Sequence, residues 1–448
     1  MKQGEIAAQA APEPRLTITR IWVKQLFGQY DYCLPSTTHI LDTKIAILYG
    51  DNGAGKTTIL SVAHHLISNA ESRGHKTAVA QVPFEEFVVE FSSDVRLRAS
   101  RPAPTDGDFE LEVIRAGNTV ESLYYRAEVD VDRGTLRVPK STHIHSFSEE
   151  ALNLIKIDSY MLGDDRTLNN DLTPTTSLRH TELGRVERYY REITGTDAGV
   201  RDNYLEFALE RATAWVRRQA LSGADVGSQN THTIYGDVAQ HLSAHVNVED
   251  DIKEANELAA TMVRELLEVS DRTNALSNFG LLSPLDISVL VAAIEAASGE
   301  RRGLIVRLLR PYVDGIRARL DALNDLYELL REFTGRLNAF LRDKTITFNI
   351  RTGFVILTSK GVVLPPDKLS SGEKHLFTLM CNLVSARQRN SVFFVDEPEL
   401  SLNVKWQREL IPALLACTKG SSVQVILATH SIELLSDHQA SVAPLRPL

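Results

Sequence analysis

One stretch near the N-terminus limits what this chain can fold into. It reads Gly50-Asp51-Asn52-Gly53-Ala54-Gly55-Lys56-Thr57-Thr58, with an apolar run (45–49) before it and an apolar helical pattern (59–67) after it. The order strand, glycine turn, helix, with the spacing G-x-x-x-x-G-K-[ST], predicts a phosphate-binding loop. Glycines let backbone amides converge on an anion, and the helix start adds its free N–H groups and the positive end of its dipole.

The side chains of this loop have separate expected tasks. Lys56 supplies a cation for the terminal phosphates, and the Thr57 hydroxyl is suited to bind Mg²⁺. A chance glycine turn before a helix is the other interpretation, and the flanking strand and helix patterns make it the weaker one. We therefore predict a nucleoside-triphosphate site with Mg²⁺, whose residues here are Asn52, Gly53, Ala54, Gly55, Lys56, Thr57 and Thr58.

The length, composition and net charge of the 448 residues limit the classes of protein to which the chain can belong. The length allows about three domains, or one large core with an insertion. No run approaches the roughly 18 apolar residues that span a bilayer, and residues 1–14 read as an Ala- and Pro-rich tail without the apolar centre of a signal peptide. Three cysteines without metal or redox spacing fit a reduced, cytoplasmic setting. The net charge of −9 argues against DNA as an obligatory partner without excluding it.

The pattern along the chain predicts an α/β fold in which helices interrupt two halves of one nucleotide-binding unit. Residues 15–170 contain the phosphate loop, alternating runs typical of an antiparallel sheet, and a strand over 155–162 that returns to the core. Residues 171–344 have a helical pattern, and 345–437 again mix strands and helices. Residues 438–448 read as a short tail with prolines.

The last predicted helix of the insertion carries an apolar seam with alternating spacings of three and four. A partner helix must cover this seam, either within the chain or on another subunit. Internal packing is the favoured interpretation, because the stretch is too short for a long coiled-coil arm. The seam comprises Val313, Ile316, Leu320, Leu323, Tyr327, Leu330, Thr334, Leu337 and Leu341.

A second anion-binding pattern comes late in the chain, where Ser370, Ser371, Gly372 and Glu373 open an apolar helix. Hydroxyls and amides at a helix start can point together at a phosphate. The same residues also fit a plain capping box, because Ser370 and Glu373 have its spacing.

Two later apolar strands end in chemistry-bearing residues. The run 391–395 leads to Asp396 and Glu397, and the run 423–429 leads to His430. Parallel strands present such residues at their carboxyl edge. Asp396 is expected to bind Mg²⁺ with Thr57, Glu397 to polarise the attacking water, and His430 to contact the γ-phosphate.

The four motifs in this order resemble the soluble ABC-type ATPases of the RecF and SMC group. This resemblance implies an ABC-ATPase head in which two subunits sandwich two ATP molecules. Ser370, Ser371 and Gly372 would then contact the γ-phosphate bound to the opposite subunit, so hydrolysis would need at least a dimer and would be slow and coupled to assembly. Two motif positions depart from the group, because Gln81 is only a weak candidate for the Q-loop glutamine and Asn403 stands where many relatives carry His.

Within that group, the segments 396–403, 406–407 and 428–431 look like the branch found in bacterial defence ATPases. Within this branch, the segments 23–28, 47–53 and 163–166 look most like the AriA family, the ATPase subunits of PARIS anti-phage systems. This resemblance implies a sensor and scaffold that holds a separate effector, such as the Toprim nuclease AriB, until a phage-encoded trigger is met. A DNA-maintenance ATPase of the RecF kind and a scaffold that uses ATP only to assemble are the alternatives.

Overall fold

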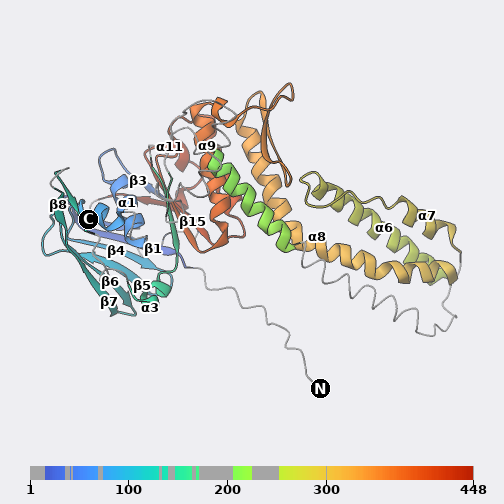
Figure 1. Cartoon of the computed structure of the whole chain (residues 1–448), viewed down its shortest axis with the longest axis horizontal. Coiled ribbons are helices and arrows are strands. Elements are labelled where there is room, and N and C mark those ends of the chain that lie inside the picture. Colours follow the sequence, from blue (N-terminus) through green and yellow to red (C-terminus); the bar gives the residue numbers. More distant parts are fainter. Residues whose placement is uncertain are drawn as a thin grey trace, which may run out of the picture. The chain divides into compact units, whose positions relative to one another are not determined.

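The computed structural model describes residues 16–35, 41, 44–68, 74–130, 134–139, 147–163, 168–170, 205–223, 252–298 and 300–446. The chain forms two compact units (Figure 1): Met1–Asp202 with Ala386–Leu448, and Asn203–Ser385. The predicted tail 1–14 and residues 164–166 lie outside the described residues, as do the parts 171–204 and 224–251 of the predicted helical region.

A mostly parallel sheet forms the centre of the first unit. Its strand order is β11-β10-β14-β15-β3-β16, and only β11 runs antiparallel to its neighbour. The strands are β3 (Ile45–Tyr49), β10 (Asp158–Leu162), β11 (Leu168–Asn170), β14 (Ser391–Asp396), β15 (Val423–Thr429) and β16 (Val442–Pro444). Every residue of β14 and β15 is buried, as expected for apolar parallel strands covered on both faces.

An antiparallel sheet of six strands completes the first unit and confirms the sheet predicted for this region. Its order is β2 (Tyr30–Leu34), β1 (Ile18–Leu26), β4 (Glu86–Phe91), β5 (Val95–Ser100), β6 (Phe109–Arg115) and β7 (Asn118–Tyr125). Strand β5 was not predicted separately. Its residues alternate between apolar and polar, and one of the polar residues, Arg98, forms salt bridges across the sheet with Glu86 and Glu112. A short hairpin, β8 (Glu128–Asp130) and β9 (Thr135–Arg137), adds two more strands.

Helix α1 (Lys56–Ile67) is buried between the two sheets. It packs on β10, β14 and β15 of the parallel sheet and on β5 of the antiparallel sheet, and two thirds of its residues are buried. Its apolar residues belong to one core with β1, β4 and β6. The buried Gln424 of β15 also joins the two sheets, because its amide accepts a hydrogen bond from Ile18 N–H (2.8 Å) and donates one to Ile18 C=O (2.9 Å).

Smaller elements flank these sheets: α2 (His75–Ala80), α3 (Glu149–Leu154), α10 (Val404–Thr418) and α11 (Ile432–Leu435). The segment predicted as a C-terminal tail is different in part, because β16 adds to the sheet edge beside β3. Leu445 N–H also donates to Tyr49 C=O at 2.7 Å. Such a short strand leaves little pattern in the sequence, and Pro444 is tolerated because the strand lies at an edge.

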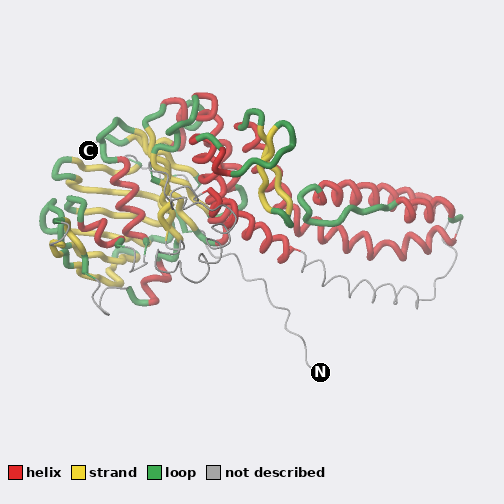
Figure 2. Tube along the Cα trace, turned by 45° about the horizontal axis from the view of Figure 1, so that its top comes forward, coloured by secondary structure: helices red, strands yellow, loops and turns green. Residues whose placement is uncertain are grey.

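The second unit is mostly helical. Its helices are an unlabelled one over 205–223, α6 (Ile252–Ser277), α7 (Ser288–Ala296), α8 (Glu300–Phe340) and α9 (Ser371–Ser385). Figures 1 and 2 both show α6 beside the first part of α8. The two helices run parallel, because Arg310 pairs with Glu265 and, further along both helices, Arg272 pairs with Asp321.

The predicted seam lies on α8, and its cover comes from the same chain. Val313, Leu320, Leu323, Leu330 and Leu337 are all nearly inaccessible, and α6 makes extensive contact with α8. Internal packing was therefore the right choice between the two possible covers. Gly280 and Pro284, two residues that break helices, lie between α6 and α7.

A hairpin of β12 (Lys344–Asn349) and β13 (Gly353–Thr358) follows α8. This hairpin and α9, which were predicted to belong with the C-terminal ATPase lobe, pack with the helices of the second unit. Short 3-10 turns occur at Pro366–Lys368, Ala386–Gln388 and Gln439–Ser441. Among the described residues, no helix is both long and apolar enough to cross a membrane.

Candidate functional site

The phosphate loop connects β3 to α1, as predicted. Gly53 and Gly55 have φ angles of +82° and +85°, which favour glycine. A Cβ at Gly55 would lie 3.1 Å from Leu26 Cδ2, so the approach of β1 adds a second reason for glycine there. Tyr32 of β2 also holds the loop, because its hydroxyl donates to Ala54 C=O at 3.0 Å.

The start of α1 can accept an anion. Its N-cap residue is Gly55, and within the described part of the chain no side chain caps the first turn. The free amides of that turn and the helix dipole favour a phosphate there. Residues 51–53 and Thr57 are exposed, whereas Thr58 is half-buried.

Lys56 is the cation of this loop, and its side chain is only 5% exposed. Its ammonium donates to Gly50 C=O (2.9 Å) and Asp51 C=O (3.1 Å). It also lies 3.7 Å from Glu397 Oε1. A positive charge is thus held directly over the loop and beside the carboxylate that follows β14.

Strand order explains how Glu397 and His430 reach the loop. The strands β14, β15 and β3 are consecutive neighbours, so the residues after their carboxyl ends meet at one edge. Glu397 has a φ of +46°, and its N–H donates to Ala428 C=O of β15 at 2.9 Å. Its Oε2 lies 2.6 Å from His430 Nδ1. The Glu397 carboxylate therefore contacts both Lys56 and His430.

Glu399 is a member of this cluster that sequence reasoning did not assign. It is 6% exposed, and its Oε1 accepts hydrogen bonds from the N–H groups of His430 and Ser431, each at 3.2 Å. The same oxygen accepts a bond from the Thr429 hydroxyl. Glu399 thus fixes the segment that carries His430. The second Glu in Asp396-Glu397-Pro398-Glu399 was the only sequence signal for it.

The cluster changes the acid–base behaviour of Glu397. Burial, followed by the hydrogen bond and negative charge of Glu399, raises its pKa to about 7, and His430 opposes this rise. The carboxyl group therefore changes protonation near neutral pH, where a general base is most effective.

The residues present fit the expected ATP and Mg²⁺. The donors predicted for the metal, the Thr57 hydroxyl and the buried Asp396 carboxylate, are oxygens, which Mg²⁺ prefers. They come from the start of α1 and the end of β14, the two elements that also carry Lys56 and Glu397. The glycine loop and the start of α1, which no side chain of the described residues caps, are suited to bind the phosphates.

The residues Ser370, Ser371, Gly372 and Glu373 belong to the second unit. Ser370 and Glu373 form a reciprocal capping box at the start of α9: Ser370 N–H donates to Glu373 Oε2 (2.7 Å), and Glu373 N–H donates to Ser370 Oγ (3.3 Å). Lys344 also donates to Glu373 at 2.8 Å. Burial opposes ionisation of Glu373, but the bonds to Lys344 and Ser370 outweigh it and lower its pKa.

The capping box and the anion-binding pattern are compatible. Ser370 and Ser371 are exposed, and the Ser370 hydroxyl accepts its internal bond, which leaves its hydrogen to donate. The Glu373 carboxylate accepts hydrogen bonds from Ser370 N–H and Lys344 within the turn. Its contact with a nucleotide stays a prediction.

The two departures noted in the sequence have local roles. Asn403 is the N-cap of α10, where its side chain accepts a hydrogen bond from Trp406 N–H. Gln81 ends α2 and donates to Leu136 C=O at 2.7 Å, so its amide is used within the antiparallel region.

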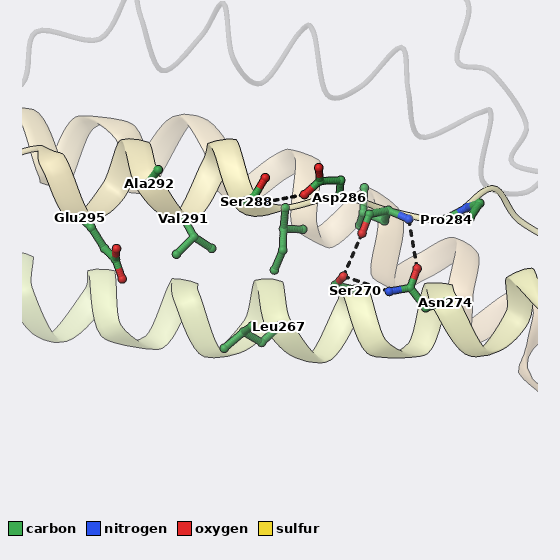
Figure 3. Close-up of a pocket in the computed structure, with 11 residues that line it drawn as sticks. Leu267, Ser270, Asn274, Pro284, Asp286, Ser288, Val291, Ala292 and Glu295 are labelled. Carbon is green, nitrogen blue, oxygen red and sulfur yellow. Dashed lines mark hydrogen bonds between the residues drawn. The ribbon is translucent and has the colours of Figure 1, made fainter.

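The second unit contains a pocket of about 680 Å³. Figure 3 shows residues that line it. It lies between α6 and the segment 284–295, which Ser270 anchors by donating to Leu285 C=O at 2.9 Å. No predicted site residue lines it, and neither does any Lys or Arg. This lining does not suit a triphosphate.

A known protein family matches most of this chain. The family described as "AAA domain, putative AbiEii toxin, Type IV TA system" matches residues 45–436. The chain belongs to this AAA family. The match of this AAA ATPase domain runs from β3 to just beyond α11, so it includes the phosphate loop, both carboxylates and His430.

Solved structures similar to this family member include Smc heads. One is the Smc head domain of Pyrococcus furiosus with an extended coiled coil, bound to the C-terminal domain of ScpA (12% identity, TM-score 0.39, 96% of this chain and 94% of that chain). Another is an Smc head bound to the C-winged helix domain of ScpA (10%, 0.35, 94% and 91%). A third is the Smc head domain of Pyrococcus yayanosii with a coiled coil and joint (13%, 0.36, 96% and 95%). A search of curated proteins found no match. The predicted α/β fold class is confirmed by the two sheets and their helices.

Proposed function

We propose that this chain is an ABC-type ATPase that hydrolyses ATP at the edge formed by β14, β15 and β3. The observation that carries this proposal is the contact of Glu397 with both Lys56 and His430. This contact supports the roles of Lys56 as the cation, Glu397 as the base and His430 as the hydrogen-bond donor, next to a helix start that no described side chain caps. These are the parts that phosphoryl transfer to water requires.

Each residue has a distinct task in this proposal. Lys56 and the amides at the start of α1 bind the terminal phosphates, while Thr57 and Asp396 hold Mg²⁺, which neutralises phosphate charge. Glu397 accepts a hydrogen bond from the attacking water when it is ionised. His430 lies beside Glu397 and donates to the γ-phosphate, while Glu399 keeps the His430 segment in position.

We further propose that the site is completed by a second copy of the chain, which contributes Ser370, Ser371 and Gly372 to the γ-phosphate. This assignment rests on the resemblance to RecF- and SMC-type ATPases, and the exposure of Ser370 and Ser371 supports it. Hydrolysis is then slow and coupled to assembly.

The biological role proposed for this assembly is that of an anti-phage sensor that holds a separate effector, such as a Toprim nuclease, and releases it when a phage-encoded trigger is met. The resemblance to AriA ATPases motivates this role.

The test of this role is to express the chain with its neighbouring gene, challenge the cells with phage, and purify the assembly with and without ATP. Protection that is lost in Lys56→Ala, together with a co-purifying effector, is the expected result. Hydrolysis that DNA stimulates, with affinity that falls steeply as salt rises, would point instead to a DNA-maintenance ATPase.

A further inference from the structure

Three histidines lie together at the opposite end of α1 from the phosphate loop. His64 and His65 are in the last turn of α1, and His75 is the first residue of α2. Their ring centroids are 5.1 Å (His64–His65), 5.5 Å (His64–His75) and 5.1 Å (His65–His75) apart. One ring nitrogen from each lies within 4.8 Å of those of the other two. None of the three belongs to the proposed ATP site.

The spacing of these nitrogens is close to that of a metal site. His65 Nδ1 and His75 Nδ1 are 2.8 Å apart. Ligand nitrogens about 2.0–2.1 Å from a tetrahedral Zn²⁺ lie about 3.3 Å from each other. The observed spacings, from 2.8 Å to at most 4.8 Å, bracket this value, so small ring rotations suffice.

The hydrogen bond between His65 and His75 is compatible with metal binding by both residues. In a neutral pair, one Nδ1 donates a hydrogen to the other. For both atoms to bind a metal, that hydrogen must move to Nε2 of its own ring. Each ring then stays neutral, as metal-binding imidazoles are, and no net proton is released.

His64 is oriented from outside the cluster. Its Nδ1 lies 2.8 Å from the hydroxyl of Ser159 on β10, and both residues are buried. Metal-binding histidines usually have one ring nitrogen fixed by such a hydrogen bond, which leaves the other as the ligand atom. The bond to Ser159 thus fixes the orientation of the His64 ring at the cluster.

Charge and ligand type indicate which ion fits. Three imidazoles suit Zn²⁺, Co²⁺, Ni²⁺ or Cu²⁺ and are poor ligands for Mg²⁺. Lys76 is a positive charge nearby, and it donates to the C=O groups of His65, Leu66 and Ser68 at the end of α1. This charge reduces affinity for a cation, so the ligands must supply the binding energy themselves.

We propose that His64, His65 and His75 bind one transition-metal ion of the Zn²⁺ class, with a water molecule as the fourth ligand. The ion connects the end of the phosphate-loop helix to α2 and, through Ser159, to β10. No pattern in the sequence indicated this site. His64 and His65 are adjacent in a helix, which is not a typical metal-ligand spacing, and His75 joins them only in the folded chain. The proposal does not depend on ATP hydrolysis.

The test uses Co²⁺ as the probe, added to the metal-free full-length chain without nucleotide. We expect one Co²⁺ per chain, a visible absorption band of four-coordinate Co²⁺, and a higher thermal unfolding midpoint that a chelator reverses. His65→Gln and His75→Gln should each lose the band. Ser159→Ala, which keeps all three ligands, should weaken binding by about 10- to 100-fold.

Two control variants locate the ion. His438→Gln removes a histidine outside the cluster and should keep the band. His430→Gln tests the other group that could hold a metal, Glu397, Glu399 and His430, and should also keep it. The proposal is overturned if the wild-type chain gives no band and no change in its midpoint, if both cluster variants keep the band, or if only His430→Gln removes it. Circular dichroism confirms that each variant is folded.

Discussion

Glu397 is the residue on which the proposed chemistry depends most. Its left-handed backbone is uncommon for a residue with a long side chain and costs on the order of 1 kcal/mol. The N–H bond to Ala428 holds this conformation. With this backbone conformation, the chain turns away from the direction of β14 and the Glu397 carboxylate contacts both Lys56 and His430.

The raised pKa of Glu397 predicts a pH dependence. A pKa of about 7 means that the carboxyl group is protonated in acid and cannot accept a hydrogen bond from water. The rate of ATP hydrolysis should therefore rise as the pH increases through about 7, whereas ATP binding through Lys56 should change little over that range. Initial rates of phosphate release measured across neutral pH test this, and a flat profile would contradict it.

Two substitutions of Glu399 separate its charge from its hydrogen bonds. Glu399→Gln removes the charge but keeps an acceptor for His430 N–H, so the acidic limb of the pH profile should move to lower pH. Glu399→Ala also releases the His430 segment and should lower the maximal rate by roughly tenfold or more. The exposed Glu409→Gln on α10 is the control and should match the wild type. Identical profiles for both Glu399 variants and the wild type would refute this role.

Residues of the site differed in how far the sequence could reveal them. Lys56, Asp396, Glu397 and His430 each lie in or next to a strongly patterned strand or helix, so the local sequence could indicate them as candidates. The contact of Glu399 with Thr429 to Ser431 and the grouping of His64 with His75 depend on which strands and helices become neighbours. No local pattern records that.

At the scale of elements, the order β14-β15-β3 decides the geometry of the site. The apolar runs predicted each strand but not that β15 would separate the other two. Similarly, the seam on α8 predicted a buried face, whereas its cover, α6, and their parallel direction come from tertiary packing. Strand β16 is too short for its pattern to stand out.

The bridge between the two sheets of the first unit gives a stability prediction. Gln424→Ala leaves both backbone groups of Ile18 without the amide bonds they now make, and each buried polar group left unpaired costs about 1–3 kcal/mol. The apparent free energy of unfolding in urea should fall by about 2–4 kcal/mol, after allowing for partial relaxation. The exposed Gln439→Ala should change it by less than about 0.5 kcal/mol. Equal stability of the two variants would contradict the bridge.

For the whole molecule, the proposal makes the active form an assembly. The phosphate loop and the residues around Glu397 belong to the first unit, and the Ser370–Glu373 turn belongs to the second. The sequence motifs and their order predicted both parts. The basis for joining them across two copies is the resemblance to ABC-type ATPases.

A substitution in the second unit tests this arrangement. Ser371 is exposed at the start of α9, so Ser371→Arg should leave folding and ATP binding at the phosphate loop intact while blocking the approach of a second copy. Hydrolysis and the ATP-dependent increase in particle mass should both be lost. Ser436→Arg, at another exposed serine, should keep both. Full hydrolysis by a monomeric Ser371→Arg protein would rule out the composite site.

The most direct test of the central claim is to measure ATP binding and phosphate release on the same samples of the wild-type chain, Lys56→Ala and Glu397→Gln. The account predicts that the wild type binds and hydrolyses ATP, that Lys56→Ala does neither, and that Glu397→Gln binds ATP but releases phosphate at least about 100-fold more slowly. Turnover by Glu397→Gln at the wild-type rate would contradict the claim that this carboxylate polarises the attacking water.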